Sequence, residues 1–321
     1  MRAVYLEADA VSRNDLDFSP ITSVVDTTIF GNTTEQDKYE HIGDSEIVFA
    51  NKILFDEETF QRCPGLKYIG VCATGYNVID LEATRRHGVT VTNVPAYSTE
   101  SVAQLTWGLI LDNASRISLH DRSVHAGDWI KSQSFCYWLS PVVELAGKTI
   151  GIVGYGNIGK RVAEIARAFH MEVLVHTAHP ENYAGNAPEG IRFVTLSELF
   201  AGSDVITLHC PLTAGTKEMI CSETIGQMKD GVMFINVSRG GLVREADLAE
   251  ALRSGKVSAA AVDVVSVEPM REDNPLLKAP NMIITPHIAW ASLEARKRLI
   301  GVVASNLQAW LDGKPVNVCE A

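Results

Sequence analysis

The chain has 321 residues, of which 46% are hydrophobic, a composition that is ordinary for a globular protein. This length is enough for two domains that each bury a core of their own. The formal net charge is −11, from 28 Lys and Arg against 39 Asp and Glu, which argues against nucleic acid and against an anionic membrane surface as partners.

The sequence also argues against secretion and against metal binding. Acidic residues follow the N-terminus too soon for a signal peptide, and no apolar run is long enough to span a bilayer. The six cysteines are scattered without a Cys-x-x-Cys pair, as is typical of reduced thiols and not of a disulfide framework. No cluster of His, Asp and Glu has the spacing of metal ligands. We therefore expect a cytoplasmic protein without a metal.

The first hundred residues alternate short apolar strands with amphipathic helices, a pattern that predicts a parallel sheet. The strands are expected at residues 4–6, 47–49, 68–71 and 89–91. A long helix is predicted over residues 98–120. The aromatic-rich segment 127–141 follows, and it would line either an active-site mouth or a subunit interface.

A second series of strands and helices begins with the apolar strand 149–153. Its further strands are expected at residues 173–175, 205–208, 232–236, 259–262 and 282–284. The last predicted helix, 292–311, lies beyond this series, and we expect it to return to the first domain. The fold class is therefore α/β, with two doubly wound parallel-sheet domains, one inserted into the other.

The segment Gly154-Tyr155-Gly156-Asn157-Ile158-Gly159 directly follows strand 149–153 and opens a helix with an apolar stripe. Gly154 would allow the tight turn, Gly156 the approach of a pyrophosphate, and Gly159 the packing of the helix on the strand. The N–H groups at the start of the helix favour phosphate. A purely structural glycine turn is the alternative, but this context predicts a dinucleotide-binding Rossmann domain.

The end of the next predicted strand bears on the choice of cofactor. An acidic residue at that place would bind the ribose 2′-hydroxyl, but the chain continues as Thr177-Ala178-His179-Pro180. No Arg stands there either. Thr177 and His179 are able to bond to either cofactor, so we expect NAD and leave NADP open.

Three ionisable residues each follow a predicted strand: Arg239, Glu268 and His287. Ligands of open α/β sheets bind beyond the carboxyl ends of the strands, so we expect all three to face one crevice. Taken singly, Arg239 would more often be a surface ion-pair residue, Glu268 a solvated loop residue and His287 a core histidine.

Together with the glycine loop, the stretches 208–213, 236–240, 268–269 and 286–287 resemble the D-isomer-specific 2-hydroxyacid dehydrogenase family over essentially the whole chain. The resemblance implies an oxidoreductase that transfers a hydride between NAD(P)H and a small 2-oxo acid. It implies that His287 is the acid/base, that Glu268 pairs with it and favours the imidazolium, and that Arg239 clamps the substrate carboxylate.

The resemblance implies further contacts and an assembly. The residues that it assigns to the cofactor, beside Gly154, Gly156 and Gly159, are Asn157, Ile158, Thr177, Cys210, Pro211, Thr216, Val237 and Asp263. The backbone of Thr74, Gly75 and Tyr76 would bind the substrate carboxylate. A flavodoxin-like substrate domain (residues 1–100 plus 291–321), an inserted cofactor domain (101–290) and a homodimer are also implied.

Similarity within the family favours hydroxypyruvate or D-glycerate as the substrate. Asn51 and Lys52, just after a first-domain strand, are candidates to contact its terminal hydroxyl, and a solvated loop is the alternative. Glyoxylate and D-lactate-type reduction use the same machinery. An NAD(H)-sensing binding protein of the same fold is the alternative from a different class.

Overall fold

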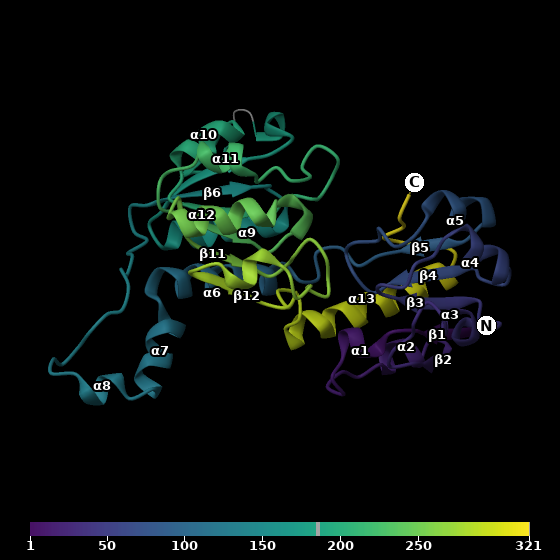
Figure 1. Cartoon of the computed structure of the whole chain (residues 1–321). Helices are drawn as coiled ribbons and strands as arrows, with labels where there is room; N and C mark the ends of the chain where they lie inside the picture. Colours follow the sequence, from purple (N-terminus) through teal and green to yellow (C-terminus); the bar gives the residue numbers. More distant parts are fainter. Residues whose placement is uncertain (184–186, 321) are drawn as a thin grey trace. The chain divides into compact units, whose positions relative to one another are not determined.

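The computed structural model describes residues 1–183 and 187–320, and the chain divides into two compact units. Unit 1 combines Met1–Ser98 with the segment that begins at Trp290, and unit 2 is Thr99–Ala289. Unit 2 is therefore inserted in sequence between two segments of unit 1 (Figure 1).

Unit 1 is built on a five-stranded sheet in the order β2-β1-β3-β4-β5, with every pair parallel. Its strands are β1 (Arg2–Tyr5), β2 (Asp26–Ile29), β3 (Ile47–Ala50), β4 (Tyr68–Val71) and β5 (Thr90–Thr92). This is the flavodoxin-like order. Four of these strands are predicted from the sequence, and β2 is not.

The helices of unit 1 cover this sheet. They are α1 (Ala8–Val11), α2 (Ser19–Thr22), α3 (Lys38–Ile42), α4 (Glu57–Arg62), α5 (Leu81–His87) and α13 (Leu293–Leu311). α13 comes from the end of the chain. Its buried face repeats every fourth residue, at Ala295, Leu299, Val303 and Leu307, and shares a core cluster with Tyr5 and Phe49. The last predicted helix is therefore part of the core of unit 1.

Unit 2 is built on a seven-stranded sheet in the order β12-β11-β10-β9-β6-β7-β8, again with every pair parallel. The strands are β6 (Thr149–Val153), β7 (Glu172–His176), β8 (Ile191–Phe193), β9 (Val205–Leu208), β10 (Val232–Asn236), β11 (Val257–Val262) and β12 (Met282–Ile284). The order reverses at β6, as in a Rossmann fold. The predicted fold class is confirmed, with a Rossmann unit inserted into a flavodoxin-like one.

The helices of unit 2 are α6 (Thr99–Ser115), α7 (Ile117–His125), α8 (Asp128–Lys131), α9 (Asn157–Ala168), α10 (Leu196–Gly202), α11 (Ser222–Gly226) and α12 (Glu245–Ser254). The prediction of one helix over residues 98–120 is wrong. Arg116 has a φ of +55°, and this left-handed residue breaks the helix between α6 and α7. The Asp112 carboxylate accepts bonds from Ser118 N (2.8 Å) and Oγ (2.7 Å) at the start of α7. α7 and α8 extend away from the sheet of unit 2 (Figure 1).

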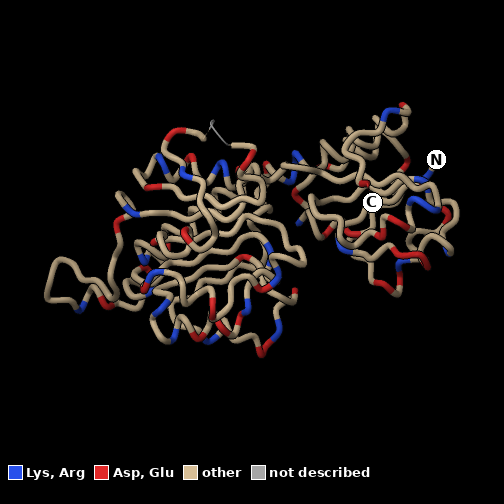
Figure 2. The backbone as a smooth tube through the Cα atoms, turned by 90° about the horizontal axis from the view of Figure 1, so that it is seen from above, with Lys and Arg blue, Asp and Glu red and all other residues tan. Residues whose placement is uncertain are grey.

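The charged residues in the described part of the chain are of mixed sign. Acidic and basic residues are interspersed along the backbone of both units (Figure 2). Within the described residues, no helix is long and apolar enough to cross a bilayer. In the same part of the chain, no group of three His, Cys, Asp or Glu residues has the geometry to hold a metal ion.

The start of α13 provides a test of helix capping. Ser292 Oγ accepts the N–H of Ala295 (3.2 Å), so Ser292→Ala should lower the free energy of unfolding by about 1 kcal/mol in urea denaturation. Ser305→Ala is the control. Ser305 lies within the same helix, is exposed and donates to Gly301 O (2.9 Å), so its loss should change stability by less than about 0.5 kcal/mol. Equal effects of the two variants would contradict the capping role.

Candidate active site

The glycine loop begins where β6 ends. Gly154 has a φ of +100°, and a Cβ there would lie 2.6 Å from the carbonyl carbon of His209. A Cβ on Gly159 would collide with the carbonyl oxygen of Gly154, whereas a Cβ on Gly156 would meet no atom within 4 Å. α9 begins at Asn157, so its first N–H groups have no partner within the helix. The loop therefore has both the space and the donors for a pyrophosphate.

No carboxylate stands directly at the end of β7. Thr177 is half-buried, and the exposed His179 ring pairs through Nδ1 with Glu181 Oε1 at 3.0 Å. The pKa of Glu181 is lowered by a hydrogen bond from its own backbone N–H and by His179. The nearest acid along the chain is thus already engaged with a histidine, a pairing that the sequence analysis misses.

The loop after β9 lies against the glycine turn. Burial lowers the pKa of His209 to about 3, so its ring is neutral at physiological pH and bonds to Thr207 Oγ1 at 3.0 Å. Cys210 is buried, and its carbonyl oxygen accepts Ser238 Oγ at 2.5 Å. Thr216 Oγ1 donates to Pro211 O at 2.8 Å. The segment 210–216, which we call the wall, therefore begins beside Gly154 and is held by hydrogen bonds of Cys210 and Thr216.

Arg239 follows the end of β10. The Asn236 side chain shapes this turn, since it donates to Arg239 O (2.9 Å) and accepts from Ser238 N (3.0 Å). Val237 is buried beneath the turn. The Arg239 side chain is exposed and donates to Ser238 O (2.8 Å), with no carboxylate in ion-pair distance among the residues described. Its guanidinium retains donors for an external anion.

His287 and Glu268 form a pair. Nδ1 of His287 lies 2.7 Å from Oε2 of Glu268, and the two side chains are 31% and 34% exposed. Glu268 Oε1 accepts the N–H of Val265 at 3.2 Å, which fixes the carboxylate. His287 has a φ of +55°, a conformation that a non-glycine residue adopts only where its surroundings hold it. The geometry presents a half-exposed imidazole whose orientation is set by a carboxylate.

Asp263 holds the loop that carries His287. It is 1% exposed, and its Oδ1 accepts from Thr285 Oγ1 (2.5 Å) and from Ile288 N (2.9 Å), while Oδ2 accepts from Ala289 N (2.8 Å). Its carbonyl oxygen accepts the N–H of His287 at 2.8 Å. Burial raises the pKa of Asp263, partly offset by these bonds. A contact of Asp263 with the nicotinamide stays a prediction, since both carboxylate oxygens already bond within the loop.

The predicted residues of unit 2 share one edge of the sheet. The glycine loop, the wall at Cys210, Arg239, Glu268 and His287 all follow the carboxyl ends of the adjacent parallel strands β6, β9, β10, β11 and β12. This is the edge at which open α/β sheets bind ligands.

In unit 1, the predicted residues lie beyond the end of β4. Thr74 is anchored by its hydroxyl to Val94 O at 2.8 Å. Within the described chain, the backbone N–H groups of Thr74, Gly75 and Tyr76 donate no hydrogen bond, and these residues are exposed or half-buried. Asn51 is buried and donates to Cys72 O (3.2 Å), whereas Lys52 is exposed. Glu7, which holds the backbone of Asn51 and Lys52, is a residue that the sequence analysis misses.

The chain is similar to known proteins over its whole length. Residues 107–289 match the model for "D-isomer specific 2-hydroxyacid dehydrogenase, NAD binding domain". A hydroxypyruvate reductase of Blautia hydrogenotrophica is 44% identical over 321 residues, which cover 99% of each chain. A glycerate dehydrogenase of Methylorubrum extorquens is 41% identical over 290 residues and 90% of each chain.

Solved structures agree with these relatives. The crystal structure of the TT0316 protein from Thermus thermophilus superposes with a TM-score of 0.88 at 32% identity, over 99% of each chain. A family model that matches more than half of the chain, together with relatives above 40% identity along nearly all of it, identifies the family. The chain therefore belongs to the D-isomer specific 2-hydroxyacid dehydrogenase family and is an NAD(P)-dependent oxidoreductase.

Proposed function

We propose that this chain reduces hydroxypyruvate to D-glycerate with NADH as the reductant. The observation that carries the proposal is the 2.7 Å contact between His287 Nδ1 and Glu268 Oε2, on the sheet edge that also holds the glycine loop and the exposed Arg239. The choice of substrate is supported by the relatives at 44% and 41% identity, which are named for hydroxypyruvate and glycerate.

In this proposal, His287 supplies the proton. A dihydronicotinamide cofactor, when bound, would supply the hydride for the carbonyl carbon. The carbonyl oxygen must gain a proton at the same time, so that the 2-oxo acid becomes a 2-hydroxy acid. Because Nδ1 of His287 is bonded to Glu268, Nε2 is the ring nitrogen left to donate that proton. In the oxidation direction, Nε2 accepts the hydroxyl proton instead.

Two groups are proposed to hold the substrate carboxylate. The Arg239 guanidinium is exposed and has donors to spare, and its planar fork matches a carboxylate. The second group is the backbone of Thr74, Gly75 and Tyr76, whose N–H groups donate to no described residue.

The cofactor is proposed to bind along the same edge. Gly154, Gly156, Asn157, Ile158 and Gly159 would hold the pyrophosphate, as the unpartnered N–H groups at the start of α9 support. Thr177, Cys210, Pro211 and Thr216 would line the adenine-ribose, and Val237 and Asp263 the nicotinamide. We propose NAD as the preferred form, since residues 177–183, which follow β7, contain no Lys or Arg to bind a 2′-phosphate.

We also propose a role for each unit and a cellular location for the protein. Residues 101–290 would be the dinucleotide-binding domain and residues 1–100 plus 291–321 the substrate domain. A cytoplasmic location is supported by six free cysteines, three of them buried. Glyoxylate and D-lactate-type reduction, and an NAD(H)-sensing binding protein of the same fold, are the competing functions.

A homodimer is proposed, built through the segment 117–143, which we call the arm. Large apolar side chains of the arm are exposed, to 90% at Ile130, 88% at Phe135 and 71% at Trp138. Exposed Trp129, Leu139 and Val142 lie in the same segment. A cluster of exposed apolar side chains on one segment marks an interaction surface. The partner that fits is a second copy, because the arm leaves the sheet of its own unit (Figure 1).

A cavity where α6 ends supports the same assembly. Its volume is about 380 Å³, and Asn113, Arg116, Arg122 and Asn281 contribute to its lining. Asn113 is 3% exposed, yet neither its Nδ2 nor its Oδ1 bonds to any described residue, and the same holds for Arg116 Nε. An amide needs one donor and one acceptor, which the backbone of a second copy would supply.

The substrate proposal is tested with a kinetic panel of hydroxypyruvate, glyoxylate, pyruvate and phosphohydroxypyruvate, each with NADH and NADPH. We expect kcat/KM to be highest for hydroxypyruvate with NADH, by about tenfold or more, because the other acids lack its terminal hydroxyl or carry a phosphate. A higher value for glyoxylate or pyruvate would transfer the assignment to that acid. No turnover with any of them would favour the binding protein.

The role of His287 is tested by His287→Ala, which should lower kcat by about 10²-fold or more through the loss of the proton donor. His87→Ala is a matched control. His87 Nε2 also pairs with a glutamate, Glu57 Oε1, at 2.8 Å, but His87 belongs to α5 of unit 1 and follows no strand of unit 2. The control should keep the kcat of the unaltered chain. Near-normal turnover of His287→Ala would show that His287 is not the proton donor.

The homodimer is tested by analytical ultracentrifugation. The double variant Ile130→Asp, Phe135→Asp places charges on the exposed part of the arm and should convert the dimer to a monomer. Leu277→Asp is the control, since Leu277 is also exposed (52%) in unit 2 but lies outside the arm. A chain that is already monomeric, or a double variant that remains dimeric, would contradict the interface.

A further inference from the structure

Glu7 is a buried carboxylate at the end of β1. It is 7% exposed, and both of its oxygens face the backbone that follows β3. Oε2 accepts from Asn51 N (2.7 Å), Lys52 N (2.9 Å) and Ile53 N (3.3 Å), and Oε1 accepts from Lys52 N (3.1 Å). One side chain thus binds three consecutive N–H groups, which have lost their sheet partners because β3 ends at Ala50.

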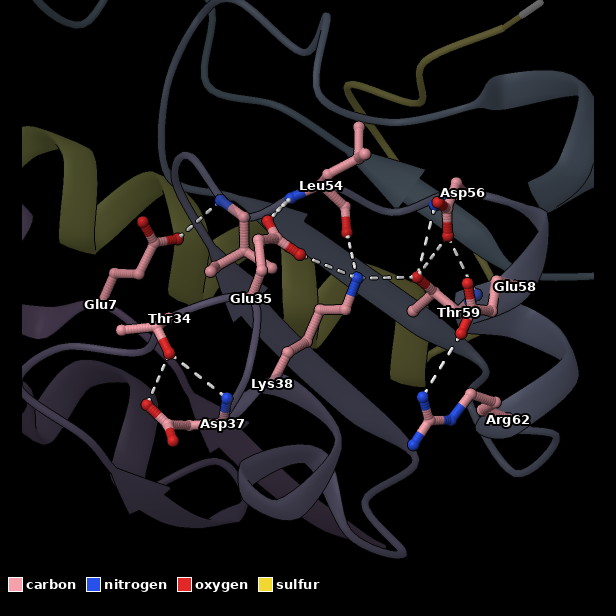
Figure 3. A network of polar contacts seen from close by, with 11 residues as sticks. Glu7, Thr34, Glu35, Asp37, Lys38, Leu54, Asp56, Glu58, Thr59 and Arg62 are labelled. Atoms are coloured by element: carbon pink, nitrogen blue, oxygen red, sulfur yellow. Dashed lines mark hydrogen bonds and ion pairs between the residues drawn. The ribbon is translucent and has the colours of Figure 1, made fainter.

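A second carboxylate continues this arrangement. Glu35 Oε1 accepts the N–H of Leu54 at 2.9 Å, and its Oε2 pairs with Lys38 Nζ at 3.1 Å. The Lys38 side chain is 3% exposed, and its ammonium also donates to Leu54 O (2.8 Å) and to Thr59 Oγ1 (3.0 Å). Figure 3 shows Lys38 reaching between Leu54 and Thr59, with Glu35 beside it.

The whole loop 51–56 is therefore fixed by side chains and by one neighbouring segment. Phe55 N donates to Val78 O (2.9 Å), and Asp56 N donates to Thr59 Oγ1 (3.4 Å). Each of its six consecutive N–H groups has a partner, four of them on the carboxylates of Glu7 and Glu35. Hydrogen bonds to ionised acceptors are the stronger kind, so this loop is held more tightly than an ordinary exposed loop.

The loop after β4 is attached to this scaffold. Asn51, whose N–H is bound by Glu7, donates through Nδ2 to Cys72 O at 3.2 Å. Cys72 immediately precedes Ala73–Tyr76, the segment with unpartnered N–H groups. The other side of that segment is fixed at β5, since Val94 N donates to Ala73 O (3.0 Å) and Thr74 Oγ1 donates to Val94 O (2.8 Å).

We infer that Glu7 is a positioning residue for substrate binding, acting through Asn51 on the loop 73–76. The inference rests on the proposed function, in which that loop binds the substrate carboxylate. Glu7 touches no reacting atom. It fixes where Asn51 lies, and Asn51 fixes the end of β4 from which the N–H groups of Thr74, Gly75 and Tyr76 project. A displacement of these donors by a fraction of an ångström weakens the hold on the substrate and leaves the cofactor site unchanged.

The test compares Glu7→Gln, Asn51→Ala and their double variant with Glu46→Gln. Glu46 is the control, a carboxylate just before β3 that pairs with Lys67 Nζ at 2.6 Å and has no bond to the loop 51–56. Glu7→Gln replaces one acceptor oxygen by an amide donor, so we expect KM for hydroxypyruvate to rise about tenfold or more, with little change in kcat or in KM for NADH. Asn51→Ala should show the same pattern, and the double variant should add little to either change. Glu46→Gln should match the unaltered chain.

Hydrogen exchange is the second measurement. In Glu7→Gln, the amides of residues 51–53 and those of Cys72 and Val94, which donate to Ala50 O (2.8 Å) and Ala73 O (3.0 Å), should exchange faster, while those of β6 stay protected. A folded Glu7→Gln with unchanged substrate KM would overturn the inference. A parallel decrease in kcat, NADH binding and Tm would also overturn it, because that result indicates general destabilisation. Should Glu7→Gln fail to fold, a rise in substrate KM alone in Asn51→Ala supports the inference and an unchanged KM overturns it. If the unaltered chain reduces no 2-oxo acid, the proposed function fails. Unchanged exchange at Cys72 and Val94 in Glu7→Gln then overturns the positioning role as well, whereas faster exchange there supports it.

Discussion

Every pair of the strands named in the two sheets is parallel, and this constraint determines where the loops and their functional side chains lie. After each parallel strand, the chain crosses back to the end of the sheet where the next strand begins. The carboxyl ends of all strands therefore lie at the same end of the sheet. At that end the chain leaves the sheet, and its N–H groups lose their ladder partners. In unit 2 the glycine loop, Arg239, Glu268 and His287 all stand at such positions.

In each unit, a buried carboxylate accepts unpaired N–H groups that follow a strand. In unit 2, the buried Asp263 accepts the N–H groups of Ile288 and Ala289 and so fixes the loop that carries His287. In unit 1, the buried Glu7 accepts the N–H groups that follow β3. A buried carboxylate is costly unless it is fully hydrogen-bonded, and a run of unpaired N–H groups is costly unless acceptors are supplied. Each group satisfies the other, and the result is a loop with one defined conformation.

The sequence predicts the buried parallel strands well, because their apolar runs are covered on both faces. It misses β2 and β8, the outermost strands at one side of each sheet. Three of the four side chains of β2 are exposed, and only the first of the three in β8 is buried, so no apolar run marks either strand. The break at Arg116 escapes prediction because neither Gly nor Pro marks it. The chemistry of His287 and Glu268 is predictable from their places after strands, whereas the use of Glu7 and of the Asn51 side chain depends on contacts between strand ends that no local pattern encodes.

The insertion of unit 2 has a consequence for the order in which the protein forms during synthesis. Unit 2 is a single continuous segment, with all seven of its strands in one stretch of chain. Unit 1 lacks the face of its core that α13 provides until the ribosome has passed through the whole of unit 2. Domains generally form as units in the order of their synthesis. By this rule unit 2 would form before unit 1 is complete, because α13 follows unit 2 in the chain and contributes to one face of the core of unit 1.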